Sequence, residues 1–496
     1  MVDNPPDGRN RFTLGPWLFL RLLALVHLCA FVSFWVQLGG LVGPHGVLPA
    51  ADFFHAAHEH FGAVAYAQLP SLCWLFGAQT FLHVLCAAGV VLSLLLFAGV
   101  APAPCLVLLW TAYLSLVCAG QIFYEFQWDA LLLETTLLAV FFAPWSWLPL
   151  WRRAEPPRLA RWLVWWLLFR LMFLSGIVKL TSGDPTWRHL TALTFHYKTQ
   201  PLPTPLAWYA CHLPAWFQRV SCAVMFFVEL VAPFALFAPR CWRHMAVLLL
   251  IGLQFLIALT GNYAFFNLLT IALCLPCFDD AWLQRIAAKF PPAEKIPAPA
   301  DGSGLWFAPV WPLRIFAGLV FLLTALLASL DFSVRLPGPI EAGLDAVGPF
   351  RSLNNYGLFA VMTTTRPEII IEGSDDGQAW RPYEFRWKPG RLTRAPGWAA
   401  PYQPRLDWQM WFAAFEGVDQ NRWVVSLCAH LLRGTPQVLA LLGPNPFPEH
   451  PPRYIRAVLY DYHFTDRAAR AQTGQWWRRT VSDFYLPPIS LREDAR

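Results

Sequence analysis

The stretch that decides the fold is RWLVWWLLFRLMFLSGIVKLT, residues 161–181. As a helix it is long enough to cross the hydrocarbon core of a bilayer, which takes about 20 residues. Two cations, Arg170 and Lys179, lie inside this apolar run. A cation at the centre of a membrane helix is unfavourable by about 2.5–3.5 kcal/mol, so such residues usually have partners and functions. The stretch therefore predicts a transmembrane helix whose internal charges mark the candidate functional site.

The composition of the whole chain supports a membrane protein. Of its 496 residues, 56% are hydrophobic and only 14% are charged, and the mean hydropathy is +0.42. Soluble globular chains carry roughly 25% charged residues. The apolar runs end near Phe332, which predicts a polytopic membrane domain over 1–335 and a soluble C-terminal domain over 336–496. The runs predict nine spans, at about 17–38, 71–97, 102–120, 129–149, 161–181, 216–238, 244–260, 263–279 and 309–332.

The Lys and Arg residues of the short loops are concentrated on one side of the predicted membrane. One side holds the basic groups, namely Arg9, Arg11, Arg152, Arg153, Arg158, Arg161, Arg240, Arg243, Arg285, Lys289 and Lys295. Because basic loops stay in the cytoplasm, the N-terminus is expected there. Nine spans would then send the C-terminal domain to the periplasm or a lumen. The segment 281–308, rich in Pro and Ala, is expected to be a cytoplasmic linker.

Several other classes of protein are disfavoured. The formal net charge of +6 comes from these loop residues, so nucleic-acid binding is not expected. The N-terminus MVDNPPDGRN is polar and the first apolar run is long, which predicts an anchor rather than a cleaved signal. Of the eleven cysteines most fall in apolar runs, where they pack as small hydrophobes, and Cys274 and Cys277 form a C-x-x-C without a thioredoxin-like context.

The C-terminal region has the pattern of a small β-rich α+β domain, plausibly a sandwich. Residues 366–387 predict a β-hairpin around the Asp376–Gly377 turn. Strands are expected at 454–465 and 475–487, and a helix at 422–442 interrupted at Pro436. The acidic turn at 374–377 could bind calcium, but a hairpin turn explains it without an ion.

Charged residues inside the apolar runs form the first candidate site. Asp129 and Glu134 follow Glu125 at the entry to the fourth span, and Glu229 lies in the sixth. Arg170 and Lys179 are nine residues apart and so face different directions on a helix. We expect Arg170 to pair with Glu134 or Glu229 as a structural lock.

Lys179 has two interpretations. It lies near the end of its span, so the simpler one is that its amine reaches the interface. In the other, Lys179 lines a polar cavity where a lowered pKa leaves a neutral amine that can act as a base. Ser175 lies one turn before Lys179 on the same face, with Gly176 permitting close helix contact.

Two loop segments are weaker candidates. The proline-rich segment TFHYKTQPLPTP contains His196 and Tyr197, and we expect a shaped binding or packing surface rather than a catalytic centre. The segment at 53–62 holds His55, His58 and His60, whose spacing loosely resembles a metal site. An amphipathic interfacial helix is the preferred interpretation, so no metal site is predicted, and no motif identifies a cofactor.

Several separated motifs resemble the lipase maturation factor family of membrane proteins. They are QLGGLVGPHGVLP (37–49), QWDALLLE (127–134), LSGIVKLTSGDPTW (174–187), FHYKTQPLPTPLAWY (195–209), GNYAFFNLLTIALCL (261–275), RPEIIIEGSDDGQAWRPYEF (366–385) and PYQPRLDWQMWFAAF (401–415). The resemblance implies a role in the folding or assembly of secreted lipases, or of other exported proteins, with the C-terminal region engaging the client. By that match the candidate client-binding residues are Arg366, Glu372, Trp380, Tyr383, Arg405, Asp407, Trp408 and Trp411.

A shorter segment resembles the vitamin K-dependent γ-carboxylase. There LSGIVKL would carry a lysine base, which falls on Lys179, and this implies a membrane-embedded enzyme acting on a lipid, quinone or peptide. The essential histidine of that enzyme has no counterpart near Gln127 and Trp128. Such a protein is expected in the endoplasmic reticulum membrane of a eukaryote or the inner membrane of a bacterium. The absence of an N-x-S/T sequon and the wealth of Arg, Ala and Pro favour a bacterium.

Overall fold

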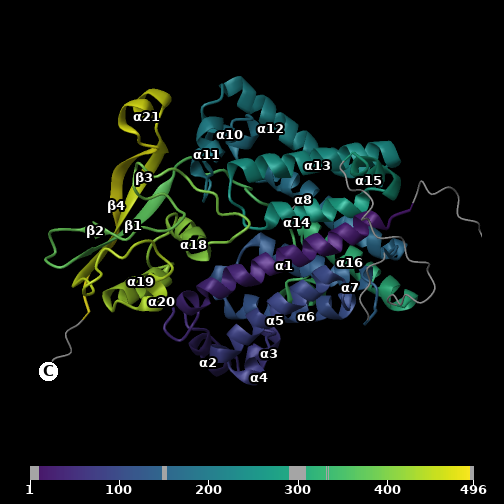
Figure 1. Cartoon of the computed structure of the whole chain (residues 1–496), viewed down its shortest axis with the longest axis horizontal. Coiled ribbons are helices and arrows are strands. Elements are labelled where there is room, and N and C mark those ends of the chain that lie inside the picture. The colour runs from purple at the N-terminus through teal and green to yellow at the C-terminus, as the bar shows by residue number, and fades with distance from the viewer. Residues whose placement is uncertain (1–10, 148–152, 290–308, 331, 333, 492–496) are drawn as a thin grey trace, which may run out of the picture.

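A computed structural model describes residues 11–147, 153–289, 309–330, 332 and 334–491 (Figure 1). The helices of the first half are α1 (Leu14–Leu41), α2 (Ala50–Phe61), α3 (Val64–Gln68), α4 (Cys73–Phe76), α5 (Ala78–Ala98), α6 (Pro102–Ala119), η2 (Gln121–Tyr124), α7 (Gln127–Phe142), α8 (Arg158–Thr181), α9 (Pro185–Arg188), α10 (Leu193–Thr199) and α11 (Pro205–Cys211). They are followed by α12 (Ala215–Leu230), η3 (Ala232–Phe237), α13 (Arg240–Thr260), α14 (Phe266–Cys274), η4 (Leu275–Cys277), α15 (Asp280–Ala287) and α16 (Val310–Leu330). The C-terminal part comprises α17 (Gly338–Val347), η6 (Gly348–Phe350), β1 (Pro367–Ser374), β2 (Arg381–Pro382), α18 (Arg405–Ala413), α19 (Arg422–Leu432), α20 (Pro436–Leu439), β3 (Tyr454–Phe464), α21 (Arg467–Thr473) and β4 (Trp477–Ile489).

Seven of the described helices are long and apolar enough to span a membrane, and the count rises to eight if a bent pair is one span. The seven are α1, α5, α6, α8, α12 with η3, α13 and α16. Helices nevertheless occupy all nine predicted stretches, and two of these helices are too short to count as full spans. The difference lies in α7, which has 16 residues, and in α14, which has nine and is followed by a sharp bend of 115° into α15.

The chain still crosses the helical bundle from one end to the other at helices α7 and α14. Helix α7 starts beside the C-terminal region, where the backbone carbonyl of Phe123 accepts from Arg405, and ends with Phe142 against Phe19 near the start of α1. At 1.5 Å per residue α7 is about 24 Å long, shorter than a bilayer core of about 30 Å. Most of its residues are buried, and a helix surrounded by protein does not need the full apolar length.

The basic ends of several helices meet at one end of the molecule. The Arg161 guanidinium lies 4.0 Å from the centre of the Phe12 ring, and the carboxylate of Asp280 accepts from the backbone N–H groups of Thr13 and Leu14, both at 2.8 Å. Arg240 at the start of α13 pairs with Asp279 at 2.6 Å. The sheet lies at the opposite end of the long axis (Figure 1).

One four-stranded antiparallel sheet forms the C-terminal part, in the order β2-β1-β3-β4. Strands β3 and β4 confirm the strands predicted at 454–465 and 475–487, and Pro436 starts α20 shortly after α19, as the predicted interruption requires. The structure has no second sheet in its described residues, so the expected sandwich is wrong there; helices α18 and α19 cover the sheet instead. The predicted hairpin is reduced to a two-residue β2, because the segment after Pro382 turns away and Phe385 bridges Leu442.

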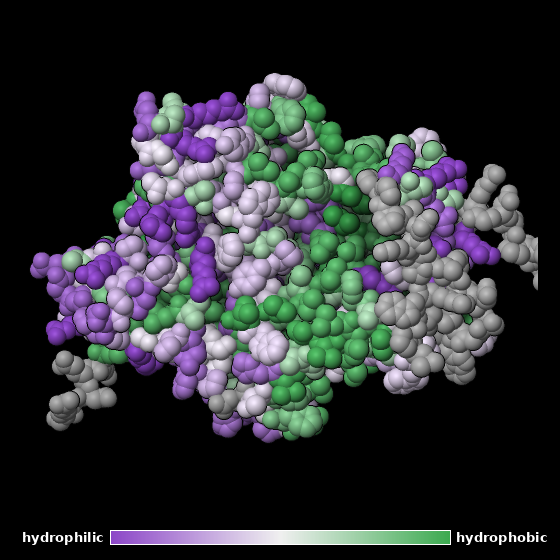
Figure 2. All heavy atoms as spheres, in the orientation of Figure 1, coloured by the Kyte–Doolittle hydropathy of each residue, from purple (hydrophilic) through white to green (hydrophobic). Residues whose placement is uncertain are grey.

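The apolar core runs without a break from the helices into the C-terminal part, since one cluster contains Phe31, Trp128, Leu269, Trp408 and Ile455. Figure 2 shows apolar residues gathered over the helices, between a polar region around the sheet and a polar patch at the other end. Of the expected linker 281–308, residues up to 287 belong to α15, and 290–308 lie outside the described residues.

Candidate functional site

Arg170 and Glu134 form a buried ion pair between α8 and α7, which confirms the predicted lock. The other carboxylate oxygen of Glu134 accepts from the Tyr356 hydroxyl at 2.7 Å and from the backbone N–H of Asn354 at 3.2 Å. Arg170 also donates to the carbonyl of Asn354 at 2.9 Å. The segment after α17 therefore inserts between the helices and is held by the same two charges.

Asp129 pairs with a residue from the C-terminal part. The two terminal guanidinium nitrogens of Arg405, Nη2 and Nη1, donate to the Asp129 carboxylate at 2.9 and 3.0 Å, and Nη1 also donates to the carbonyl of Phe123 at 2.6 Å. The guanidinium lies 3.5 Å from the centre of the Tyr124 ring, and the Tyr113 hydroxyl donates to the same carboxylate. A two-point pair of this kind fixes orientation as well as distance, so it holds α18 on the start of α7.

The other residues of α18 strengthen the same junction. The Trp408 ring packs against Trp128 at 4.7 Å between ring centres, and the indole N–H of Trp411 donates to the carbonyl of Thr199 at 2.9 Å. Asp407 accepts from the backbone N–H groups of Trp387 and Lys388, both at 2.8 Å. Burial raises the pKa of the Asp407 carboxyl, and these two N–H donors oppose the shift.

Arg366 ties the start of β1 to the outer loop. It donates to the carbonyls of Lys198 and Pro201, at 2.9 and 2.7 Å, and pairs with Glu368 at 2.9 Å. Glu368 in turn pairs with Lys388 at 2.9 Å, and all three charged side chains are buried.

The structure thus places most of the predicted client-binding residues inside the molecule. Seven of the eight are buried, namely Arg366, Glu372, Tyr383, Arg405, Asp407, Trp408 and Trp411, whereas Trp380 is half-buried against Arg456. In this conformation they join the C-terminal part to the helices or form its core. They offer no free surface to a second protein, because a side chain that fills a protein interior cannot also pack on a partner.

Lys179 does not reach the interface, so the first interpretation of this residue is wrong. Its ammonium donates to Glu229 at 2.9 and 3.1 Å and to the carbonyl of Ser175 at 2.8 Å, and it is only 4% exposed. Glu229 lies 14 residues after Ala215, which is about 21 Å along α12. Both side chains are buried between α8 and α12, and the two opposite charges stabilise each other where neither would be tolerated alone.

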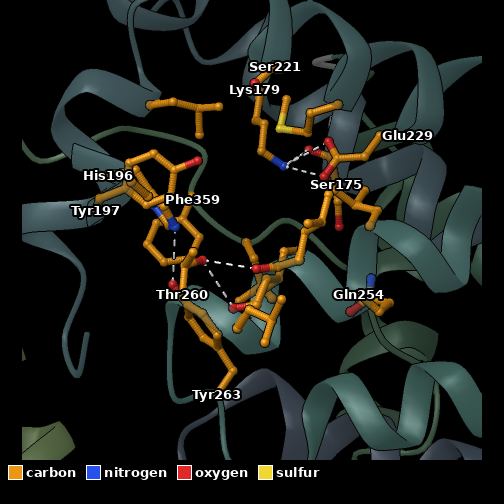
Figure 3. Close-up of a pocket in the computed structure, with 18 of the residues that line it drawn as sticks. Ser175, Lys179, His196, Tyr197, Ser221, Glu229, Gln254, Thr260, Tyr263 and Phe359 are labelled. Atoms are coloured by element: carbon orange, nitrogen blue, oxygen red, sulfur yellow. Dashed lines mark hydrogen bonds and ion pairs between the residues drawn. The ribbon is translucent and has the colours of Figure 1, made fainter. Parts of the chain in front are cut away.

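A cavity of about 470 Å³ lies beside this pair (Figure 3). Helices α8, α10, α11, α12 and α13 supply most of its walls; we call it the Lys179 cavity. Lys179, Glu229, Ser175 and Ser221 lie on one side, and His196 and Tyr197 face them from the outer loop. Most of the remaining lining is apolar: Leu171, Met172, Leu193, Leu206, Leu213, Phe217, Met225, Leu253, Leu256, Ile257, Leu259, Phe266, Leu358 and Phe359. Lys179 does line a cavity, as the second interpretation requires, but most of the cavity lining is apolar rather than polar, and the amine is engaged by a carboxylate.

The outer loop forms part of this wall, as its prolines predicted for a shaped surface. The His196 ring lies 3.4 Å from the Tyr263 hydroxyl, which donates to Gln200 at 2.8 Å. Burial and, to a smaller extent, the nearby Lys179 ammonium lower the pKa of His196 to about 4, so the imidazole is neutral at pH 7.

The remaining candidates have structural roles. Helix α2 buries Phe54 and exposes His55, His58 and His60, which confirms an amphipathic helix. The Asp376 carboxylate accepts from the backbone N–H groups of Gln378 and Ala379, both at 2.8 Å, so the acidic turn is held by its own backbone. All eleven cysteines are free. Among the described residues, no group of three acidic, His or Cys side chains could hold a metal ion.

Two polar residues that the sequence did not single out, Asn262 and Gln37, also join the helices to the C-terminal part. The Asn262 side chain accepts from the N–H groups of Ala399 and Ala400 and donates to the carbonyl of Gly397, at 2.7 to 3.0 Å. Gln37 accepts from the backbone N–H of Arg405 at 2.9 Å and donates to the carbonyl of Gln403 at 2.7 Å. Both lie in apolar surroundings within quoted motifs, and an isolated amide there is the signal that could have identified them.

These features define a class, a polytopic membrane protein whose C-terminal α+β part is locked onto its helices by buried ion pairs. The family model of the lipase maturation factor transmembrane domain matches residues 14–285, and that of the C-terminal domain of the same factors matches 352–487. The chain belongs to the lipase maturation factor family.

Individual relatives cover most of the chain. Lipase maturation factor 2 of Gallus gallus is 36% identical, over 96% of this chain and 81% of the relative. Lipase maturation factor 1 of Bos taurus is also 36% identical, over 98% and 90%, and lipase maturation factor 2 of Homo sapiens is 35% identical, over 96% and 82%. No solved structure matches the chain.

Proposed function

We propose that this chain is a membrane-anchored maturation factor that assists the folding or assembly of secreted lipases or other exported proteins. Family membership over almost the whole length is the observation that carries this proposal. The division into a membrane part, 1–335, and a client-facing part, 336–496, follows the two regions that the family models match.

The proposal includes an orientation. The gathering of basic helix ends around Phe12, far from the sheet, supports a cytoplasmic N-terminus and a C-terminal part in the periplasm or a lumen. The short helices α7 and α14 support the same arrangement, because each returns the chain to the basic end. In a bacterium the membrane would be the inner membrane, and in a eukaryote that of the endoplasmic reticulum.

Client contact is proposed for the exposed aromatic side chains of the segment 366–415, since the buried residues of this segment already pack inside the protein. These are Trp398, Phe412 and Phe415, which are 50%, 45% and 41% exposed, together with the half-buried Trp380. Aromatic side chains supply large contact areas at protein interfaces.

The test is the specific activity of a secreted lipase in cells that make this chain and in cells that lack its gene. We expect the loss of the gene to lower lipase activity per unit of lipase protein, and a W398A/F412A/F415A variant to restore less than the wild type. V481A/F484A, which removes exposed apolar side chains from β4, is the matched control. Unchanged lipase activity without the gene would refute the proposal.

A membrane enzyme that uses Lys179 as a base is the second candidate, because the cavity adjoins this residue. The ion pair with Glu229 weighs against it, since a base must be able to give up its proton and accept another. The double variant Lys179→Met/Glu229→Leu separates the two candidates, because it removes the proposed base without leaving a buried unpaired charge.

A further inference from the structure

The Lys179 cavity opens toward the bilayer. Leu206, Leu213, Phe217 and Leu256 line it and are also exposed, by 38–62% of their surface. The outer faces of α12 and α13 continue this apolar surface with Trp216, Val220, Val224 and Phe255. In a membrane protein, such a surface faces hydrocarbon, so a molecule would enter the cavity from the lipid side.

The inner end of the cavity is closed. Lys179, Glu229, Gln254 and Tyr263 line it and are each at most 6% exposed. The cavity is therefore a pocket with an apolar mouth and a polar inner end, the shape that suits an amphipathic molecule inserted with its polar end first.

The volume suits a single hydrocarbon chain. An apolar cavity of about 150 Å³ stays dry and holds one benzene, so about 470 Å³ has room for roughly three such rings, or about 18 carbon atoms. An empty cavity of this size would deprive its lining of dispersion contacts. The bilayer is the natural source of a chain to fill it.

The charges define the polar end of the occupant. Lys179 and Glu229 neutralise each other, and His196 is neutral at pH 7, so the inner end carries no net charge. In the described part of the chain, the hydroxyls of Ser221 and Tyr197 face the cavity without an internal hydrogen-bond partner. They can bond an uncharged hydroxyl or ester, whereas a charged head group would be left uncompensated in a low-dielectric site.

We propose that the Lys179 cavity binds one uncharged single-chain lipid, with an acyl tail of roughly 18 carbons and a hydroxyl or ester head group. The head group lies against Ser221, Tyr197 and the Lys179–Glu229 pair, and the tail extends toward the mouth at Leu213 and Leu256. This site is separate from the proposed client contact and does not depend on it.

The test uses the purified full-length chain in phosphatidylcholine nanodiscs with a photoactivatable monoacylglycerol, whose acyl chain has the length of oleate. We expect labelling on α12 and α13 that unlabelled monoacylglycerol prevents. Ser221→Trp puts a bulky ring into the cavity and should lower labelling about tenfold, the loss that corresponds to about 1.4 kcal/mol of binding free energy. Val220→Trp changes the neighbouring, outward-facing residue and should label as the wild type does.

Equal labelling of both variants, or labelling that monoacylglycerol does not prevent, would overturn the proposal. So would stronger competition by free oleate than by monoacylglycerol, because that would show a preference for an anion. The competition needs only the wild-type protein, and so it decides the matter even if Ser221→Trp does not fold.

Discussion

Arg405 and Asp129, 276 residues apart in the sequence, form a two-point ion pair in which neither side chain is more than 1% exposed. The arginine belongs to a region that its composition marks as soluble, and the aspartate to the start of a membrane helix. Their contact makes the C-terminal part a structural component of the bundle rather than an appended domain.

Asp129→Asn should destabilise the protein by about 3–5 kcal/mol, because it leaves the buried guanidinium of Arg405 without a counter-charge. Thermal unfolding in detergent would measure the effect. Glu155→Gln is the matched control, since the Glu155 side chain that pairs with Arg161 is 46% exposed and should contribute at most about 1 kcal/mol. The double variant Arg405→Met/Asp129→Leu should recover most of the loss; a single Asp129→Asn that unfolds like the wild type would show that the pair does not hold the halves together.

Asn262→Ala should loosen the segment 397–403 without unfolding the helices. The change leaves two backbone N–H groups and the carbonyl of Gly397 without their partner, each at about 1–3 kcal/mol if it stays buried. Hydrogen exchange at Ala399 and Ala400 should therefore become faster by orders of magnitude. Asn445→Ala removes an asparagine that bonds only its own turn, and exchange at Ala399 should then be unaffected. Equal protection of Ala399 in both variants would contradict the assigned role of Asn262.

The sequence limited the partner of Arg170 to Glu134 or Glu229, the carboxylates in the other apolar runs, and the structure selects Glu134. A charge in hydrocarbon needs a partner, and few were available. Strand β3 was predictable from its alternating residues, which can place their apolar side chains on one face only in an extended chain.

The pairs of Lys179 and Asp129 could not be assigned in this way. Lys179 lies close enough to a helix end to reach water, and only the tertiary arrangement, with α12 extending past α8, places Glu229 beside it. The partner of Asp129 belongs to a region expected to be separate. Helical periodicity reports which face of a helix is apolar, but not which distant segment will cover it.

The stability of the protein should fall as the pH decreases from about 6.5 to about 4. Burial lowers the pKa of His196 to about 4 in the folded protein, whereas an unfolded histidine titrates near 6.5. Between these values the unfolded chain binds a proton that the folded chain does not, so acid favours unfolding. His196→Gln should remove this part of the pH dependence of the melting temperature, while His55→Gln, on the exposed face of α2, should leave it in place. A pH profile that His196→Gln does not flatten would show that this imidazole is not excluded from water.

Substitutions at Lys179 and Glu229 separate a structural role from a catalytic one. Lys179→Met alone should destabilise the protein by about 3–5 kcal/mol, because the Glu229 carboxylate is left buried and unpaired. Loss of lipase maturation in that variant would therefore not distinguish a missing base from a misfolded bundle. Lys179→Met/Glu229→Leu removes both charges and keeps similar volumes, so its melting temperature should return close to that of the wild type. If the pair only holds α8 against α12, this double variant also restores lipase activity in cells that lack the native gene. A double variant that melts like the wild type but restores no lipase activity would instead establish that the charged pair itself, and not only the packing of α8 against α12, takes part in the function.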